Sequence, residues 1–581
     1  MNQPTPAIVA QNAVRRLPRI ALLLLCAAYL MPGLIGRGPW KTADIVSFGY
    51  MAELARATEG ISRWFDPSLL GLKPETPALV PYWIGAVAIK LAPAWLNPDL
   101  AVRIAFALLL WGAFTATWYA VYYLARTPRA QPVAFAFGGE ARPVDYARAM
   151  ADAALLALLA CLGLAQLGHE TTPALAQLFF ASYMFYGVAA LPFRRVGAML
   201  ALIVGAVGMA LSGAPTIALL LGLGSAALVF AERRHDAVRQ AEGAQGAAEG
   251  TGYSAAATWI IAGITLLAVL LAARLHLAHW HIALPGHRSG SSTLGDIRSL
   301  AKLLIWFTWP AWPLALWTLW RWRRQLNARH VAIPLLFMLI PLAATVTTDF
   351  SERALLLGLP AFATLAAFAL PTFRRSAAAI IDWFTLLFFS GSALIIWVIW
   401  ISLQTGVPAK PAANVARLAP GFVPSFSIAA FVFAVLATIA WCWLVRWRTG
   451  RHRPALWKTL VLPAGGAALC WMLLMTLWLP LLDYARSYVP QVNAIAERVG
   501  RPVCISELAL SRQHIAALRY HGQFELSPLV GGAACPWLLV SPDAISTLHD
   551  IVRMEQWRLS GTLRRPTSAA DDLLLFQRMT P

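Results

Sequence analysis

Charge is scarce in this sequence, and acidic residues are its scarcest charged groups. Of its 581 residues only 13% are charged, with 27 Asp and Glu against 47 Lys and Arg, while 59% are hydrophobic. About a quarter of the residues of an ordinary soluble domain are charged, so the composition excludes that class and predicts a polytopic α-helical membrane protein. No basic block resembles a nucleic-acid-binding arm, so the net charge of +20 is interpreted as a topology signal and no nucleic-acid partner is expected.

The N-terminus also lacks a convincing small-residue cleavage site after its first apolar run. Basic residues, Arg15, Arg16 and Arg19, precede that run. A basic start followed by an apolar helix without a cleavage site is typical of a signal anchor, which stays in the protein.

Apolar runs near the length of a membrane span, roughly 20 residues, recur throughout the chain. The second of about fourteen such runs, 78–95, contains Pro81 and Pro93 and is separated from the third only by Leu96-Asn97-Pro98-Asp99. If this run lies along the membrane surface, the later arginine clusters all fall on the side of the N-terminus, as the positive-inside rule requires. The sequence therefore predicts about thirteen spans, a cytoplasmic N-terminus, and a first outer loop, 37–99, with surface-lying helices.

The chain is expected to divide into a transmembrane catalytic domain, 1–482, and a soluble periplasmic domain, 483–581. Short apolar stretches at 503–505, 537–540 and 573–576 alternate with helical patterns in the second part, which predicts a small α/β domain. Cys504 and Cys535 both lie there, in a compartment that permits disulfides, so a bridge between them is expected. The alternative is a pair of unlinked core cysteines.

Carboxylates gather at the outer edge of the predicted spans. Asp44 follows the first span directly, Glu75 stands in the rigid segment K-P-E-T-P, and Glu170 follows His169 in a very short turn between two spans. A charged side chain beside hydrocarbon costs free energy and usually marks a functional site, so we predict catalytic roles for Asp44 and Glu170. The structural alternatives are helix capping for Asp44 and Glu170 and an exposed loop acid for Glu75.

The remaining polar groups favour a phosphorylated lipid as ligand, together with membrane lipids around the spans. The loop after residue 274 contains His279 and His281, which with Glu75 would hold a divalent ion (Zn, Mg or Mn), although the spacing H-x-x-H-x-H is not a recognised zinc signature. Arg288 and Arg353 are predicted to bind phosphate, because guanidinium groups pair well with phosphate oxygens. Solvated histidines, and arginines paired with nearby acids, are the alternatives. No nucleotide cofactor is expected.

These features resemble the GT-C glycosyltransferases, in particular the family of the bacterial lipid A aminoarabinose transferase and the protein O-mannosyltransferase-like enzymes. The resemblance rests on Asp44, on G-L-K-P-E-T-P-A-L-V-P-Y-W at 71–83, on A-V-R at 101–103 and on the segment 353–360. It implies a GT-C fold with a periplasmic α/β domain. It also implies catalytic roles for Asp44 and Glu170, a phosphate-binding role for Lys73, and roles in positioning donor or acceptor for His169 and Tyr82.

The motifs depart from the family pattern at several charged positions. Ile45 replaces a second acid, Ser47-Phe48 replaces an Arg-Tyr pair, Thr76 replaces a Lys, and Ser212-Gly213-Ala214 replaces Ser-Lys-Gly. Several phosphate-binding cations of the aminoarabinose enzyme are thus missing. The departures favour a divergent relative with another sugar or acceptor.

The resemblance implies a glycosyltransferase of the bacterial inner membrane. It would move a sugar from a polyprenyl-phosphate donor to lipid A, or to another envelope glycan or lipid, on the periplasmic face. A protein O-glycosyltransferase of the same fold, a flippase or transporter for a lipid-linked sugar, and a noncatalytic scaffold are the alternatives. A transporter would carry charged residues at mid-bilayer, whereas the mid-span stretches here are nearly free of charge.

Overall fold

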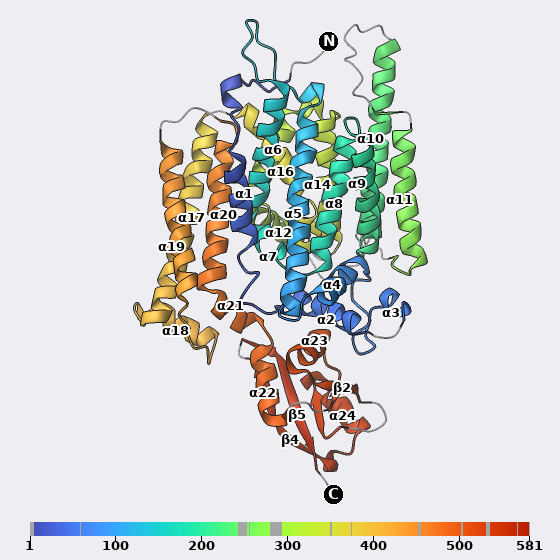
Figure 1. Ribbon diagram of the computed structural model, residues 1–581, viewed down its shortest axis with the longest axis vertical. Coiled ribbons are helices and arrows are strands. Elements are labelled where there is room, and N and C mark those ends of the chain that lie inside the picture. The colour runs from blue at the N-terminus through green and yellow to red at the C-terminus, as the bar shows by residue number, and fades with distance from the viewer. Residues whose placement is uncertain are drawn as a thin grey trace. The chain divides into compact units, whose positions relative to one another are not determined.

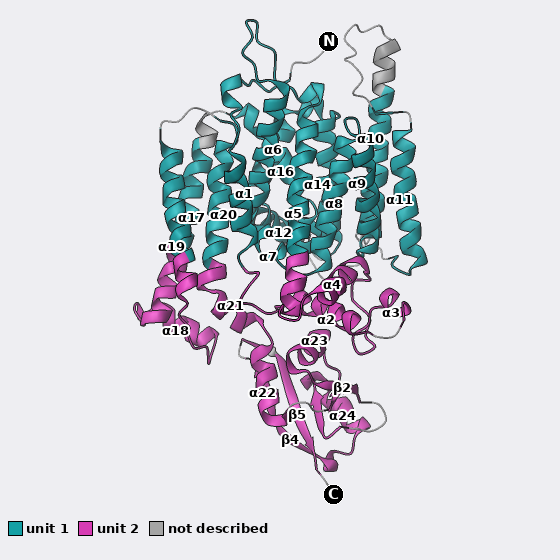
Figure 2. Cartoon of the chain, in the orientation of Figure 1, with its two compact units in different colours: residues 1–32, 106–393, 433–473 teal, residues 33–105, 394–432, 474–581 magenta. Residues whose placement is uncertain are grey.

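The protein is mostly helical, with strands in its C-terminal region. The computed structural model describes residues 5–57, 60–241, 253–254, 256–278, 293–348, 351–373, 375–450, 455–500, 504–529, 535–565 and 567–579. The chain divides into two compact units (Figure 2): unit 1 comprises 1–32, 106–393 and 433–473, and unit 2 comprises 33–105, 394–432 and 474–581. The first outer loop thus belongs to the same unit as the C-terminal region, whereas the sequence groups it with the spans.

Unit 1 is a bundle of helices that run side by side (Figure 1). The helices that lie wholly or partly in it are α1 (Arg19–Leu30), α5 (Pro98–Ala125), α6 (Pro143–Ala160), α7 (Leu162–Leu167), α8 (Pro173–Ala190), α9 (Arg195–Leu211), α10 (Pro215–Ala241), α11 (Ala257–Arg274), α12 (Thr293–Phe307), α13 (Ala311–Arg321), α14 (Arg329–Thr347), α15 (Glu352–Leu356), α16 (Leu359–Ala369), α17 (Arg375–Thr405), α19 (Ile428–Thr449) and α20 (Lys458–Leu477).

Eight of the described helices are long and apolar enough to cross a membrane, judged by length and composition: α5, α8, α10, α11, α14, α17, α19 and α20. Shorter apolar helices, among them α1, α9 and α16, complete the bundle. The predicted fold class, a polytopic α-helical membrane protein with a small C-terminal α/β region, is confirmed. The total of about thirteen spans and their orientation stay predictions.

Three predicted spans are each divided into two helices. The run 150–167 forms α6 and α7, which meet at Cys161, and 299–320 forms α12 and α13, which are separated around Pro310. The run 352–370 forms α15 and α16. At Cys161 the backbone turns tightly, with its N–H bonded to the Leu158 carbonyl at 3.1 Å, and Pro310 lacks the N–H that a continuous helix needs. Hydropathy is the same on both sides of such a break, so it does not reveal one.

Unit 2 combines the first outer loop with the C-terminal domain. Its helices are α2 (Ala43–Arg56), α3 (Ser62–Phe65), α4 (Val80–Leu91), α18 (Ala409–Leu418), α21 (Leu479–Arg486), α22 (Val489–Val499), α23 (Arg512–Ala517), the π-helix Leu518–Gly522 and α24 (Ile545–Ile551). Helix α4 has 12 residues, which at about 1.5 Å each are too short to cross a hydrocarbon core of about 30 Å. Its length fits the predicted surface-lying segment.

Helices α2 and α4 pack closely against each other. Gly85 of α4 lies so near Met51 of α2 that a Cβ atom there would stand 2.3 Å from the Met51 sulfur. The Tyr50 and Tyr82 rings meet at 5.4 Å between centroids. The first outer loop therefore has its own small core, although it is only a connection between membrane helices.

The C-terminal domain is built on one five-stranded sheet. The strands are β1 (Cys504–Leu508), β2 (Glu525–Pro528), β3 (Trp537–Val540), β4 (Trp557–Arg565) and β5 (Ser568–Arg578), in the order β2-β1-β3-β5-β4. Strands β2, β1 and β3 are parallel, and β5 runs antiparallel to both β3 and β4. The three apolar stretches that predict strands overlap β1, β3 and β5.

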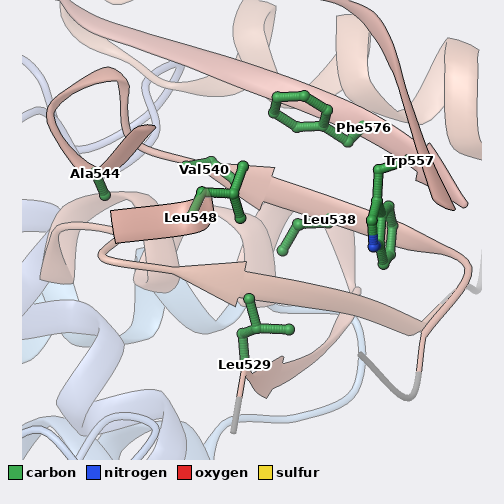
Figure 3. Packing of buried hydrophobic residues seen from close by; sticks show 7 residues of the cluster. All are labelled: Leu529, Leu538, Val540, Ala544, Leu548, Trp557 and Phe576. Carbon is green, nitrogen blue, oxygen red and sulfur yellow. The ribbon is translucent and has the colours of Figure 1, made fainter. Parts of the chain in front are cut away.

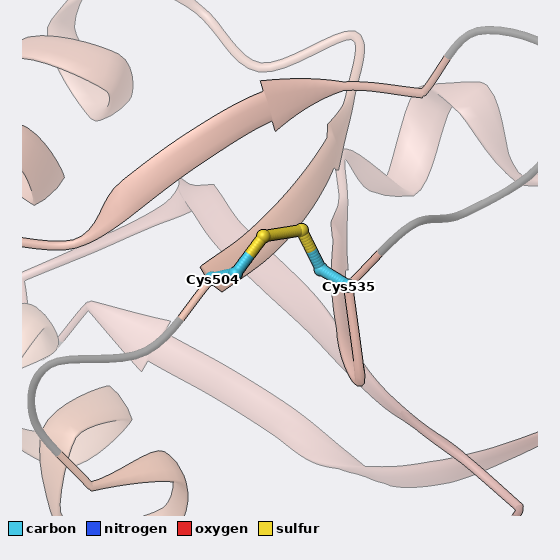
Figure 4. The surroundings of a disulfide bond; sticks show 2 residues. All are labelled: Cys504 and Cys535. Carbon is cyan, nitrogen blue, oxygen red and sulfur yellow. A yellow bond between two sulfur atoms is a disulfide. The ribbon is translucent and has the colours of Figure 1, made fainter.

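A compact apolar cluster and a disulfide stabilise this domain. Leu538 and Val540 of β3, Leu548 of α24, Trp557 of β4 and Phe576 of β5 are buried together (Figure 3). Cys504, at the start of β1, and Cys535, just before β3, form a disulfide with Cα atoms 5.3 Å apart (Figure 4). The bridge joins the beginnings of two neighbouring parallel strands.

Candidate functional site

Asp44 lies in the first turn of α2 and is buried, with 1% of its surface exposed. Its Oδ2 atom accepts a hydrogen bond from the backbone N–H of Trp40 at 3.0 Å and lies 3.5 Å from Nη1 of Arg37. Arg37 is also buried, and its Nε donates to the Gly33 carbonyl at 2.8 Å. Asp44 thus resembles a helix cap only in part. It accepts a hydrogen bond from a backbone amide, but that amide belongs to Trp40, which precedes α2. A charged pair with these extra bonds fixes the carboxylate in one orientation.

A second buried ion pair lies at the start of α5. Pro98 and Asp99 open this helix, as suits a proline at the first position and an acid in the first turn. One turn later, Arg103 donates from Nη2 to the Asp99 carboxylate and from Nε to the Asp99 backbone carbonyl, the latter at 3.2 Å. Arg103 is also within electrostatic reach of Arg37 and Asp44. The two ion pairs are therefore neighbours.

Tyr520 of the π-helix adds a residue from the C-terminal domain. Its hydroxyl donates to Oδ1 of Asp99 at 3.1 Å, and its ring meets Phe48 of α2 edge-on, 4.5 Å between centroids. Burial, followed by the charge of Asp99, raises the pKa of Tyr520, so the hydroxyl keeps its proton and acts as a donor. We refer to these residues as the Asp44 cluster: Arg37, Asp44, Asp99, Arg103 and Tyr520.

Glu170 and Arg353 form a corresponding pair in unit 1. Glu170 is buried in the turn between α7 and α8, and its two carboxylate oxygens accept from Gln166 at 3.2 Å and from Nη2 of Arg353 at 3.1 Å. Arg353 lies in α15, and its side chain is 42% exposed. The sequence predicts a role for each of these two residues separately, and the structure shows that they are partners across 183 positions.

His169 is held by backbone carbonyls. Its Nδ1 lies 2.6 Å from the Ala165 oxygen and its Nε2 lies 3.0 Å from the Tyr29 oxygen. The ring also packs against Trp471 at 4.6 Å between centroids. These contacts fix the turn that carries Glu170, so His169 is placed to orient its neighbour. Its predicted role in positioning donor or acceptor remains untested.

The predicted ligands of the first outer loop are bound by other protein groups. Glu75 has a side chain that is 79% exposed, and its Oε1 accepts from Nη1 of Arg512 at 3.0 Å. Lys73, which is 74% exposed, pairs with Asp66 at 3.2 Å. Tyr82 is buried against Tyr50, whose pKa burial raises to about 12. Tyr82 thus packs within the first outer loop, and its role in positioning donor or acceptor stays a prediction.

The remaining predicted ligands, His279, His281 and Arg288, lie outside the described residues. Among the residues that are described, no group of three His, Cys, Asp or Glu side chains gathers as a set of metal ligands. The divalent ion therefore remains a proposal.

The sequence does not identify four of these residues as parts of a site: Arg37, Asp99, Arg103 and Tyr520. Asp99 and Arg103 carry a readable signal, since an acid and an arginine four positions apart at a helix start face each other. Arg37 begins the polar segment after α1, but its burial has no sequence signature. Tyr520 has no signal either, because it reaches Asp99 across 421 positions.

The chain matches known proteins by its fold. No protein-family model and no curated protein matches it by sequence. Two solved structures match its fold over 96% of both chains at 14% identity: ArnT from Cupriavidus metallidurans bound to undecaprenyl phosphate, with a TM-score of 0.60, and the same protein in the apo state, with 0.57. The chain has a GT-C fold.

The GT-C fold agrees with the layout that the sequence predicts, a membrane bundle followed by a C-terminal α/β domain. The chain and ArnT share this fold although only 14% of their residues are identical. Within the described residues, the four charged members of the Asp44 cluster and Glu170 are buried, as are Asp152, Arg329, Arg565 and Asp571.

Proposed function

We propose that this protein is a membrane glycosyltransferase that takes a sugar from a polyprenyl-phosphate-linked donor. The observation that supports this most is the fold match to ArnT, one of whose structures holds undecaprenyl phosphate. The fixed carboxylate of Asp44, buried beside Arg37, supports the same class. Burying a charge is costly, so a carboxylate held in this way is a strong candidate for acid–base chemistry.

In the proposed reaction, the bond between the sugar's anomeric carbon and the phosphate oxygen breaks, and the lipid phosphate leaves with the electron pair. The acceptor hydroxyl forms the new bond to that carbon, through a state with oxocarbenium character. Asp44 accepts the hydroxyl proton as general base. Glu170, oriented by Arg353 and Gln166, would hold a sugar hydroxyl or the acceptor. No step of this mechanism uses a metal ion.

The proposed setting is the bacterial inner membrane, with the C-terminal domain in the periplasm and the N-terminus in the cytoplasm. The disulfide between Cys504 and Cys535 supports an oxidising compartment for that domain. The proposed acceptor is lipid A or another envelope glycan or lipid. A protein O-glycosyltransferase is the alternative within the same fold.

The experiment is mass spectrometry of envelope glycolipids and glycans from cells that lack the protein and are complemented with variants. We expect one sugar-modified species to disappear, to return with the wild-type chain, and to stay absent with Asp44→Asn at equal expression. Loss of a general base costs about 10²–10⁴-fold in rate. Asp543→Asn, at an exposed acid of the C-terminal domain, is the control and should restore the species.

Two outcomes would contradict the proposal in different ways. Full restoration by Asp44→Asn would remove Asp44 from the mechanism while leaving the reaction class intact. An envelope unchanged by deletion, together with no binding of undecaprenyl phosphate by the purified chain, would remove the reaction class itself.

A further inference from the structure

The C-terminal domain reaches the first outer loop through α23 and the π-helix that follows it. Gly49 of α2 packs so closely against Ala516 that a Cβ atom at position 49 would lie 2.6 Å from that of Ala516. Three residues further on, Arg519 pairs with Glu53 of α2 at 3.1 Å. Tyr520 stands next in the chain, and its own ring packs edge-on against Phe48, so it is held on the α2 surface.

Tyr520 uses this position to bind a carboxylate that already has a partner. Asp99 receives the Tyr520 hydroxyl on Oδ1 and the Arg103 guanidinium on Oδ2. The backbone carbonyl of Asp99 receives Nε of the same arginine. Both carboxylate oxygens of Asp99 are thus hydrogen-bonded, and the orientation of Asp99 fixes the plane of the Arg103 guanidinium.

One hydrogen-bond donor of Arg103 nevertheless remains available. Its side chain is only 6% exposed, and within the described part of the chain its Nη1 atom has no hydrogen-bond partner. A buried donor without a partner costs about 1–3 kcal/mol, and arginine offers five N–H groups in a rigid fork that matches phosphate oxygens. An anionic ligand oxygen would satisfy this donor.

We propose that the C-terminal domain completes the donor site: Tyr520, acting through Asp99, positions Arg103 so that its Nη1 edge binds a phosphate oxygen of the lipid-linked donor. This inference rests on the proposed function. Arg103 is the binding residue, and Tyr520 is a positioning residue that does not itself touch the ligand. The neighbouring Arg37 adds positive charge to the same place, while Asp44 remains paired with it.

The test measures binding of undecaprenyl phosphate, and separately of undecaprenol, to the purified full-length chain. Tyr520→Phe keeps the ring against Phe48 and removes only the hydroxyl. We expect it to weaken undecaprenyl phosphate about tenfold, equivalent to about 1.4 kcal/mol, and to leave undecaprenol binding unchanged. Inorganic phosphate as competitor shows whether the phosphate alone is recognised or only the lipid headgroup.

A double-mutant cycle separates positioning from general support of the fold. Arg103→Lys keeps the charge but loses the fork, so it should weaken undecaprenyl phosphate at least as much as Tyr520→Phe does. If Tyr520 acts through Arg103, adding Tyr520→Phe to Arg103→Lys should cause no further loss. The control is Tyr484→Phe, which removes another tyrosine hydroxyl of unit 2, one that donates to the Pro420 carbonyl at 2.8 Å, and it should bind as wild type.

Other binding results would overturn the role of Tyr520 or the proposed function. If the wild-type chain binds undecaprenyl phosphate and Tyr520→Phe binds it equally well, this inference fails while the proposed function stands. Equal weakening of undecaprenol and undecaprenyl phosphate would assign Tyr520 a structural role only, and would also overturn it. If the wild-type chain binds neither, the proposed function fails first. Should Tyr520→Phe not fold, Asp99→Asn tests the same link and should weaken only the phosphorylated lipid.

Discussion

The two units differ in how some of their polar groups are satisfied. In unit 1 several buried hydroxyls donate to the backbone carbonyl four residues earlier, as do Thr117, Ser182, Thr265, Thr308, Thr345 and Thr364. In unit 2 polar contacts join distant segments: Trp40 donates to Asp483, Tyr520 to Asp99 and Arg512 to Glu75. These contacts span 443, 421 and 437 positions.

The difference follows from the solvent of each unit. A helix in hydrocarbon must satisfy its polar groups internally, because lipid offers no hydrogen bonds. In unit 2, contacts between distant segments reduce the entropy of the chain because they close long loops. They also assemble a cluster of charges that no single helix could form. Glu170 and Arg353 form one of the ion pairs between distant segments of unit 1, as do Arg329 with Glu232 and Arg448 with Asp382.

The largest effect is expected at the pair of Arg37 and Asp44. Arg37→Met leaves a buried carboxylate without its cation, which typically costs about 3–5 kcal/mol. Thermal unfolding of the full-length chain in detergent measures this loss. Arg56→Met is the control, because Arg56 is 51% exposed and lies 3.6 Å from Glu53, so its removal should cost under about 1 kcal/mol. Equal stability of the two variants would show that the buried pair contributes no more than the exposed one.

A second and somewhat smaller effect concerns the covalent link in unit 2. Cys504 and Cys535 are 31 positions apart, and removing a disulfide that closes a loop of this size costs about 2–4 kcal/mol. The variant with both cysteines changed to Ser should therefore lose protection from hydrogen exchange in β1 and β3. The free cysteines Cys26 and Cys161 of unit 1 provide the control, since Ala at those positions should leave both strands unchanged. Unchanged exchange in the Ser variant would mean that the apolar cluster alone holds the sheet.

The contrast between the units also explains what the sequence can predict. Apolar length and arginine placement identify the bundle, and α4 follows from its prolines and from the charge asymmetry. Strands β1, β3 and β5 contain continuous apolar runs. Strands β2 and β4 do not, because they lie at the two edges of the sheet and carry polar residues such as Ser527 and Arg558. The helix break at Cys161 has no signal in the hydropathy, whereas the break around Pro310 follows from a proline that lacks the helical N–H.

The sequence identifies site residues whose charge is unusual for their position, and it does not identify most of their partners. Asp44 and Glu170 can be selected because an acid beside a membrane span is unusual. Their partners Arg37 and Arg353 are fixed by the tertiary fold, and Tyr520 reaches the cluster through the docking of a whole domain. Glu75 is a different case: a rigid acid between prolines predicts a ligand, and the structure pairs this acid with Arg512, so its role as a ligand stays a prediction. The sequence thus identifies charged residues whose burial is costly, but it does not identify the residues that neutralise them.

Glu75 offers a test of modest size that distinguishes a link between segments from a ligand. Its pair with Arg512 is largely exposed, so Glu75→Gln should cost at most about 1 kcal/mol of stability. If Glu75 acts only through this pair, Arg512→Gln should have the same effect, and chelating agents should leave activity unchanged in every variant. Loss of activity in Glu75→Gln alone, together with loss of activity on chelation, would instead establish the proposed metal ion and reassign Glu75 as its ligand.

The smallest expected effect tests the rule within unit 1. Thr364 and Thr318 are both fully buried, but Thr364 donates to Pro360 in its own helix α16, whereas Thr318 of α13 donates to Leu365 of α16 at 2.6 Å. Thr364→Val removes a bond to a carbonyl of its own helix and should be nearly silent. Thr318→Val removes a link between helices, which is worth about 0.6 kcal/mol in a membrane protein, and it also leaves the Leu365 oxygen without that donor. A difference of this size in unfolding free energy would show that links between helices matter in both units. Equal values would mean that unit 1 depends on packing alone, so that hydrogen bonds between segments are decisive only in unit 2.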